Sequence, residues 1–202
     1  DLHGTLAFVS LLSDRPDRAT RAYRRVLALR PDSALVRYQL ARLHESQDRA
    51  DSAEAQYRLS LRSAPKHIDT HQGLADLLIA NAPAPSVGQE LRVTPALQEA
   101  EELLQRVIAL DGKSLAARWS LGPLLAREGR YEASIRQFEA ILELSPDEYE
   151  AHLYLGGLYR RTGMATRAEE EFDIYTQEKR VRRMEATARS QSEELARQLL
   201  GE

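Results

Sequence analysis

The chain has 202 residues, with 28 basic and 31 acidic side chains, a net charge of -3 at pH 7 and no cysteine. This near-neutral balance argues against a general nucleic-acid-binding protein, which would carry a marked basic excess. The lack of cysteine excludes disulfides, thiolate metal sites, cysteine nucleophiles and covalent haem attachment through this chain. No segment approaches about 18 consecutive apolar residues, so the sequence predicts no transmembrane helix.

The composition predicts an all-α protein, because Leu (31 residues) and Ala (28 residues) dominate while aromatic residues make up only 6%. Arginine outnumbers lysine by 25 to 3, a bias typical of GC-rich bacterial coding that favours a bacterial source. The chain begins at Asp1 without an initiator methionine, and we expect the helical array to start before it. No targeting segment identifies a compartment, so the cytoplasm and the periplasm both remain open for a soluble protein.

The sequence repeats itself at a regular interval. Similar segments end at Pro31 and Pro65, which are 34 residues apart. Two more such segments end at Gly112 and Pro146, which are also 34 residues apart. The interval from Pro65 to Gly112 is longer than one period, which indicates an insertion. Before each ending, and once more near the C-terminus, a small residue is followed four positions later by a bulky one: Ala19/Tyr23, Ala53/Tyr57, Ala100/Leu104, Ser134/Phe138 and Ala168/Phe172. Half a period earlier lie the pairs Leu6-Ala7, Leu40-Ala41, Leu74-Ala75, Leu121-Gly122 and Leu155-Gly156.

This pattern resembles the tetratricopeptide repeat, a helix–turn–helix unit of about 34 residues. The resemblance covers residues 1–182 in five units: 1–33, 34–67, 68–114, 115–148 and 149–182. It implies an all-α, right-handed superhelical solenoid, because a single unit cannot bury its apolar face alone. Gly129, Gly163 and Asp48 stand where the first helix of a unit must turn into the second, which favours a positive φ.

Two features depart from the repeat. Unit three carries a loop insertion at about 81–95, where three prolines and Gly88 exclude a continuous helix. The insertion is either a tolerated surface loop or a loop that contacts a partner. Pro123 falls inside the predicted first helix of unit four, and we expect it to disturb that helix near Trp119.

The C-terminal segment predicts one long helix, because Thr166–Leu200 contains neither Pro nor Gly. We expect Phe172, Ile174 and Tyr175 to anchor its start. Residues 183–202 then form an extension that either caps the last repeat or docks on a partner through a weak heptad-like seam. The seam residues are Met184, Ala188, Gln191, Leu195 and Leu199.

Catalytic and cofactor-binding motifs are missing from the sequence, which contains no G-x-S-x-G element, P-loop or dinucleotide fingerprint. The pattern therefore predicts no enzyme, no cofactor and no metal site. We expect His67 and His71 to be solvated rather than metal ligands, and His44 to pack between helices. Gly156 and Gly157 are interpreted as a close-packing patch. The acidic runs Glu99/Glu101/Glu102 and Glu169–Glu171 are interpreted as a solvated outer face.

The resemblance implies that the first helices of the units line a concave groove, whose exposed residues flank each Leu-small pair. Placed on this sequence, the candidate partner-binding residues are Tyr38, Arg42, Gln72, Asp76, Trp119, Arg127, Leu153, Arg160 and Arg161, with Glu45, Ile79, Pro123, Ala126 and Gly157 at neighbouring groove positions. Aromatic and arginine side chains are typical of binding hot spots. We therefore predict a non-catalytic module that binds a segment of another protein in this groove, with no nucleic-acid partner.

Two alternatives remain open at this point. One is a structural subunit of a larger multiprotein assembly, docked through the convex face, the 81–95 loop or the C-terminal helix. The other is the repeat domain of a longer enzyme.

Overall fold

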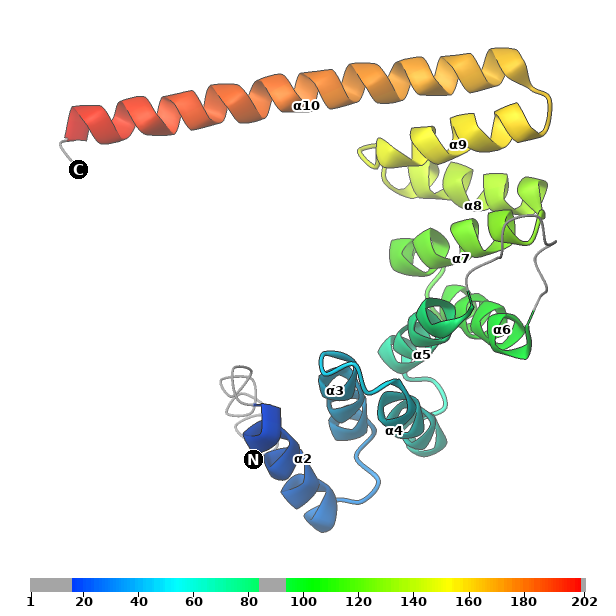
Figure 1. Cartoon of the computed structure of the whole chain (residues 1–202), viewed down its shortest axis with the longest axis vertical. Helices are drawn as coiled ribbons and strands as arrows, with labels where there is room; N and C mark the ends of the chain where they lie inside the picture. The colour runs from blue at the N-terminus through cyan, green and yellow to red at the C-terminus, as the bar shows by residue number, and fades with distance from the viewer. Residues whose placement is uncertain (1–15, 84–93, 201–202) are drawn as a thin grey trace. The chain divides into compact units, whose positions relative to one another are not determined.

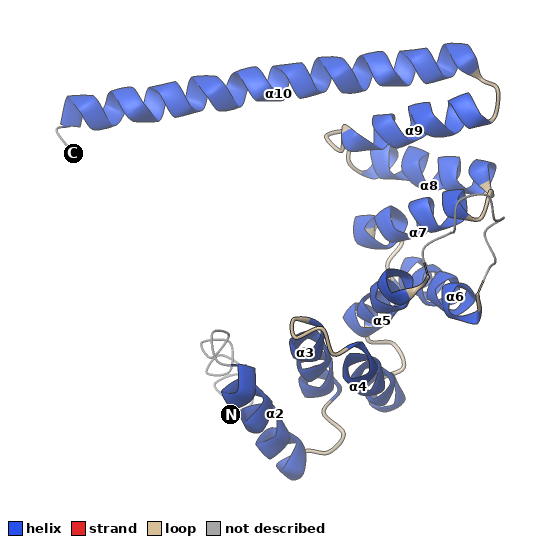
Figure 2. Cartoon of the chain, in the orientation of Figure 1, coloured by secondary structure: helices blue, strands red, loops and turns tan. Residues whose placement is uncertain are grey.

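The computed structural model describes residues 16–83 and 94–200 (Figure 1). Within these ranges the chain forms helices joined by short loops, with no strand (Figure 2). In chain order the helices are α2 (Pro16–Leu29), α3 (Ala34–Glu45), α4 (Ala50–Ser63), α5 (Ile68–Asn81), α6 (Pro95–Leu110), α7 (Leu115–Arg127), α8 (Tyr131–Leu144), α9 (Glu150–Arg161) and α10 (Ala165–Leu200). The predicted first helix of unit one and most of the 81–95 loop lie outside the described residues.

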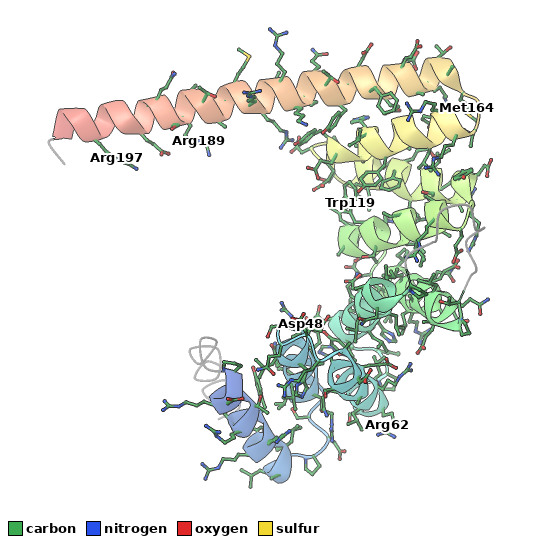
Figure 3. All side chains as sticks on the ribbon, viewed as in Figure 1. Asp48, Arg62, Trp119, Met164, Arg189 and Arg197 are labelled. Carbon is green, nitrogen blue, oxygen red and sulfur yellow. The ribbon has the colours of Figure 1, made fainter. Side chains whose placement is uncertain are left out.

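The turns between paired helices follow the predicted chemistry. Asp48, Gly129 and Gly163 have φ angles of 55°, 74° and 80°, all in the left-handed region where glycine carries no steric penalty. Asp48 lies in the loop between α3 and α4 (Figure 3).

At the start of α6, the Thr94 hydroxyl accepts a hydrogen bond from the Leu97 N–H at 3.3 Å, and Pro95 occupies the first turn.

The chain divides into two compact units, Asp1–Leu124 and Leu125–Glu202. In the first unit α3 lies beside α4, and α5 beside α6. Small residues at the helix contacts are completely buried, among them Ala41, Ala53, Ala75 and Ala100. Large side chains such as Tyr57 and Leu104 fill the space between neighbouring helices, as the repeat pattern predicts.

A buried polar contact joins three helices of the first unit. The Ser60 hydroxyl on α4 donates to the Ala34 carbonyl of α3 at 2.8 Å and lies 3.0 Å from the Thr70 hydroxyl of α5. Both hydroxyl-bearing residues are fully buried. Their hydrogen bonds satisfy polar groups that would otherwise weaken the packing.

In the second unit α9 lies beside both α8 and α10. The first part of α10 is held by aromatic contacts: the Tyr175 ring stacks on Tyr149 with centroids 5.7 Å apart, and the Arg182 guanidinium lies 4.6 Å from the Tyr149 ring centre. Arg182 also donates to the Asp147 carbonyl at 2.6 Å. Ile174 was expected to anchor this helix as well, but it is 41% exposed, because it points away from the stripe that carries Tyr175.

Beyond Arg182, α10 continues with exposed side chains throughout 183–193. Met184 is 62% exposed, and Figure 3 shows Arg189 and Arg197 farther along the same helix. None of the helices in the described ranges combines the length and the hydrophobicity that a membrane span requires.

Pro123 does not end its helix, since α7 continues through it to Arg127. The neighbouring Leu121 and Leu124 are buried, so this part of α7 is packed against the core. The predicted all-α fold with a long C-terminal helix is confirmed for the described residues.

Candidate functional site

Each unit carries a pocket that contains predicted groove residues. In the first unit, α3, α4 and α5 form a pocket of about 320 Å³, called here the polar pocket. It is lined by Tyr38, Arg42, Glu45, Tyr57, Asp69, Gln72, Gly73 and Asp76. Three carboxylates face one guanidinium in this set, so the polar pocket favours a basic side chain or an amine.

Hydrogen bonds fix the acidic end of the polar pocket. The Gln72 amide nitrogen donates to Asp76 at 2.9 Å, and the Ser120 hydroxyl of α7 donates to the same carboxylate at 2.7 Å. Gln72 also donates to Ser120 at 3.1 Å. Because the Asp76 carboxylate is oriented by two donors, it presents a fixed charge on an exposed residue.

Two tyrosines form the other wall of the polar pocket. The Tyr38 ring lies 6.0 Å from the Tyr57 ring and 5.5 Å from the His67 ring, and the Tyr57 hydroxyl donates to the Glu45 carboxylate. Burial, and then the hydrogen bond to Glu45, raises the pKa of Tyr57 above its ordinary value. Burial likewise raises the pKa of Tyr38. Both phenols therefore stay neutral at physiological pH and act as hydrogen-bonding surfaces.

The second unit carries a different pocket, of about 290 Å³, called here the Gly157 pocket. It is lined by Ala126, Arg127, Leu153, Tyr154, Gly157, Leu158 and Arg161, from the end of α7 and one face of α9. Leu153 and Tyr154 are 42% and 43% exposed, so two large side chains at neighbouring positions present apolar surface to solvent. The Tyr154 ring is held by Phe138, on which it stacks with centroids 4.7 Å apart.

Gly156 and Gly157 are adjacent in α9, but the space beside each of them is different. A Cβ atom on Gly156 would lie 2.7 Å from Cε1 of Phe172, so the ring from α10 occupies the space beside this glycine. A Cβ atom on Gly157 would meet no described atom within 4 Å. The close-packing interpretation therefore holds for Gly156 and is wrong for Gly157, because successive helix positions point about 100° apart.

Two arginines accompany the apolar walls of the Gly157 pocket, and its described lining residues include no carboxylate. The Arg161 guanidinium lies 5.7 Å from the Tyr131 ring centre, a cation–π distance. Arg160, its neighbour, turns instead to α10, where its guanidinium lies 5.6 Å from the Phe172 ring centre. The pocket thus combines apolar walls with positive charge.

The structure sorts the predicted groove residues into three sets. Tyr38, Arg42, Gln72 and Asp76 line the polar pocket, and Arg127, Leu153 and Arg161 line the Gly157 pocket. Neither pocket is lined by Arg160 or by Trp119, which is half-buried on α7 (Figure 3). The sequence interpretation missed Asp69 and Tyr154. Their spacing was the available signal, since Asp69 precedes Gln72 by three residues and Tyr154 precedes Gly157 by three.

Two polar residues outside these pockets, His71 and Glu171, are held by contacts within the fold. His71 is buried, and its Nε2 lies 3.0 Å from the Pro65 carbonyl, so the expectation that it is solvated is wrong. Glu171 is not part of a solvated face, because its carboxylate lies 2.5 Å from Nδ1 of His152 and is only 19% exposed. Within the described ranges, no group of three or more His, Asp or Glu side chains is arranged to hold a metal ion.

Several solved structures have the same fold. The structure titled "YrrB: a TPR protein with an unusual peptide-binding site" matches with a TM-score of 0.72 at 22% identity, over 94% of this chain and 92% of that one. MamA from Desulfovibrio magneticus RS-1 has a TM-score of 0.72 at 17% identity, over 88% and 96% of the two chains. PilF of Pseudomonas aeruginosa has a TM-score of 0.70 at 17% identity, over 87% and 75%. A comparison of the sequence with curated proteins found no match.

The fold and its paired helices define an all-α protein built from helix–turn–helix repeats. Models of the tetratricopeptide repeat match residues 10–77 with one model and residues 96–136 and 120–180 with another. The chain belongs to the tetratricopeptide repeat family, and it is a protein–protein interaction module. Members of this family are generally non-catalytic, and the alternative of a structural subunit is not favoured.

Proposed function

We propose that this protein binds a segment of a partner protein on the surfaces of its first helices, through the two pockets. The observation that carries the proposal is the Gly157 pocket, whose exposed Leu153 and Tyr154 flank open space on α9. The polar pocket supplies a second contact surface of opposite charge. The residues proposed to contact the partner are Tyr38, Arg42, Gln72, Asp76, Arg127, Leu153 and Arg161.

A protein or peptide fits these surfaces better than a nucleic acid does. The net charge of -3 supplies no general attraction for phosphates, and the polar pocket is acidic. We also propose that the chain has no enzymatic activity, because proteins of this repeat family are generally non-catalytic interaction modules. YrrB, a protein of the same fold that has a peptide-binding site, agrees with this proposal.

The five units predicted from the sequence remain part of the proposal, with boundaries at 33, 67, 114, 148 and 182. In this arrangement α3, α5, α7 and α9 are the first helices of units two to five. The residues that line both pockets come from these first helices, except Tyr57 of α4. Membership of a larger complex is compatible with the exposed side chains at 183–193 of α10.

A selection from a random 12-residue peptide library against the full chain tests the proposal. We expect specific peptides to be enriched, and we expect Asp76→Ala or Leu153→Ala to weaken their binding measured by fluorescence polarisation. Arg106→Ala, an exposed substitution on α6 outside both pockets, serves as the control and should change nothing. A library that yields no binding peptide, or binding that no pocket substitution affects, would rule the proposal out.

A further inference from the structure

We propose that the Gly157 pocket receives one large apolar side chain of the partner, next to an aspartate or glutamate that pairs with Arg161. This inference rests on the proposed function and adds the chemical class of the segment that is bound. It follows from three features of the pocket: an unexplained glycine, exposed apolar walls, and positive charge without a lining carboxylate.

Gly157 lies in the interior of helix α9. Glycine is the least favourable residue inside a helix after proline, so a glycine there lowers the stability of the helix unless close packing compensates. Gly156 has such a reason within the chain, since the Phe172 ring occupies the space of a side chain. Gly157 has none among the described residues, because its Cβ position is open. The space beside Gly157 is therefore open to a side chain that none of the described residues supplies.

The walls of this space select an apolar group. Leu158 is buried, while Leu153 and Tyr154 keep more than two fifths of their surface exposed. The volume of about 290 Å³ is ample for a leucine, methionine or phenylalanine side chain, since a cavity of about 150 Å³ accommodates benzene. Burying such a side chain removes apolar surface of both molecules from water.

The charge of the pocket selects the neighbouring residue. Arg127 and Arg161 are the only charged residues among the described lining residues, and both are positive. The Arg161 guanidinium is oriented by the Tyr131 ring, which reduces the entropy lost when it pairs with a carboxylate. A basic partner residue would be repelled here, whereas the acidic polar pocket of the first unit would accept it.

The test uses the peptides selected from the random library and the full-length chain. We expect those that bind the Gly157 pocket to share a large apolar residue within four positions of an aspartate or glutamate. Gly157→Leu should fill the pocket and weaken their binding by about tenfold or more, the range of a lost interface anchor. Ala109→Leu, which adds the same bulk at an exposed position of α6, is the matched control and should leave binding unchanged.

The acidic residue is tested with a double-mutant cycle. Arg161→Ala, and replacement of the peptide's carboxylate by the corresponding amide, should each weaken binding by about fivefold, and the two losses should not add. The dependence of binding on salt should also become shallower in Arg161→Ala.

The outcomes separate this inference from the proposed function. If peptides bind and respond to Asp76→Ala but not to Gly157→Leu, the interaction function stands and the apolar pocket assignment is wrong. If bound peptides carry no acidic residue and Arg161→Ala has no effect, the charge assignment is wrong. If no peptide binds the chain, both proposals fail.

Discussion

Gly156 of α9 and Phe172 of α10 form a matched pair, in which the aromatic ring occupies the space where any other residue at position 156 would carry its Cβ. The ring is also covered by the Arg160 guanidinium, 5.6 Å from its centre. This contact fixes how closely the long C-terminal helix approaches α9. Gly157 lies beside this contact on the same helix but takes no part in it.

We expect Gly156→Ala to destabilise the protein by about 1–3 kcal/mol, because the added methyl group would lie 2.7–2.8 Å from two atoms of the Phe172 ring and force it to move. Gly157→Ala is the matched control. It adds the same methyl group into open space and should leave stability unchanged or raise it by up to about 1 kcal/mol, the helix preference of alanine over glycine. Urea unfolding followed by circular dichroism measures both; equal stability of the two variants would contradict the packing described here.

The turn at Asp48 offers a stabilising change. Asp48 adopts a φ of 55°, the conformation that glycine supplies at Gly129 and Gly163. We expect Asp48→Gly to stabilise the protein by about 0.5–1 kcal/mol, because it removes the steric penalty of a side chain in the left-handed region. Gly163→Ala should be destabilising by about 1 kcal/mol or more for the opposite reason. Thermal unfolding distinguishes the two, and the same sign of effect in both would be inconsistent with these backbone angles.

Stability should fall in mild acid in part through His44. This residue is buried, and its Nδ1 has no hydrogen-bond partner among the described residues. Burial, followed by the charges of Arg49 and Arg24, lowers the pKa of His44 below its ordinary value of 6.5. The unfolded chain therefore binds this proton more readily than the folded chain, so stability decreases as the pH falls below about 6.5.

The substitution His44→Leu tests this linkage, because it removes the titrating group while keeping the site apolar. We expect the decrease in Tm between about pH 7.5 and pH 5.5 to be smaller in the variant than in the parent protein. Parallel Tm profiles for the two proteins over this range would show that His44 does not contribute.

The outer part of α10 should contribute little to the stability of the second unit. Residues 183–193 are exposed, and the aromatic anchors all lie at or before Arg182. We expect removal of 183–202 to leave Tm within about 2 °C of the parent value, as for other surface changes. Tyr175→Ala, which removes the stack on Tyr149, should lower Tm by more than that. A large loss of Tm on truncation would mean that the terminal segment packs against the repeats.

Much of the local structure could be predicted from the sequence. The repeat period located the paired helices, and the residues at 48, 129 and 163 identified the turns, because helix formation and positive φ depend on nearby residues. The long α10 followed from the absence of Pro and Gly after Thr166.

The candidate site was only partly predictable. Helical spacing correctly grouped Gln72 with Asp76, and Leu153 with Arg161, since positions related by whole turns share a helix face. It could not separate Arg160 from Arg161, because both are arginines near the same face and only the Phe172 and Tyr131 rings decide where each one lies.

The sequence alone therefore determined the family, the helical repeats and the low net charge of this protein. Only the tertiary structure decided that the space beside Gly156 is occupied and that the space beside Gly157 is open among the described residues. The physical reason is that the space beside a helix is defined by side chains from other helices, which are distant in the sequence. Phe172 fills the space at Gly156, no described residue fills it at Gly157, and the pocket exists because of that difference.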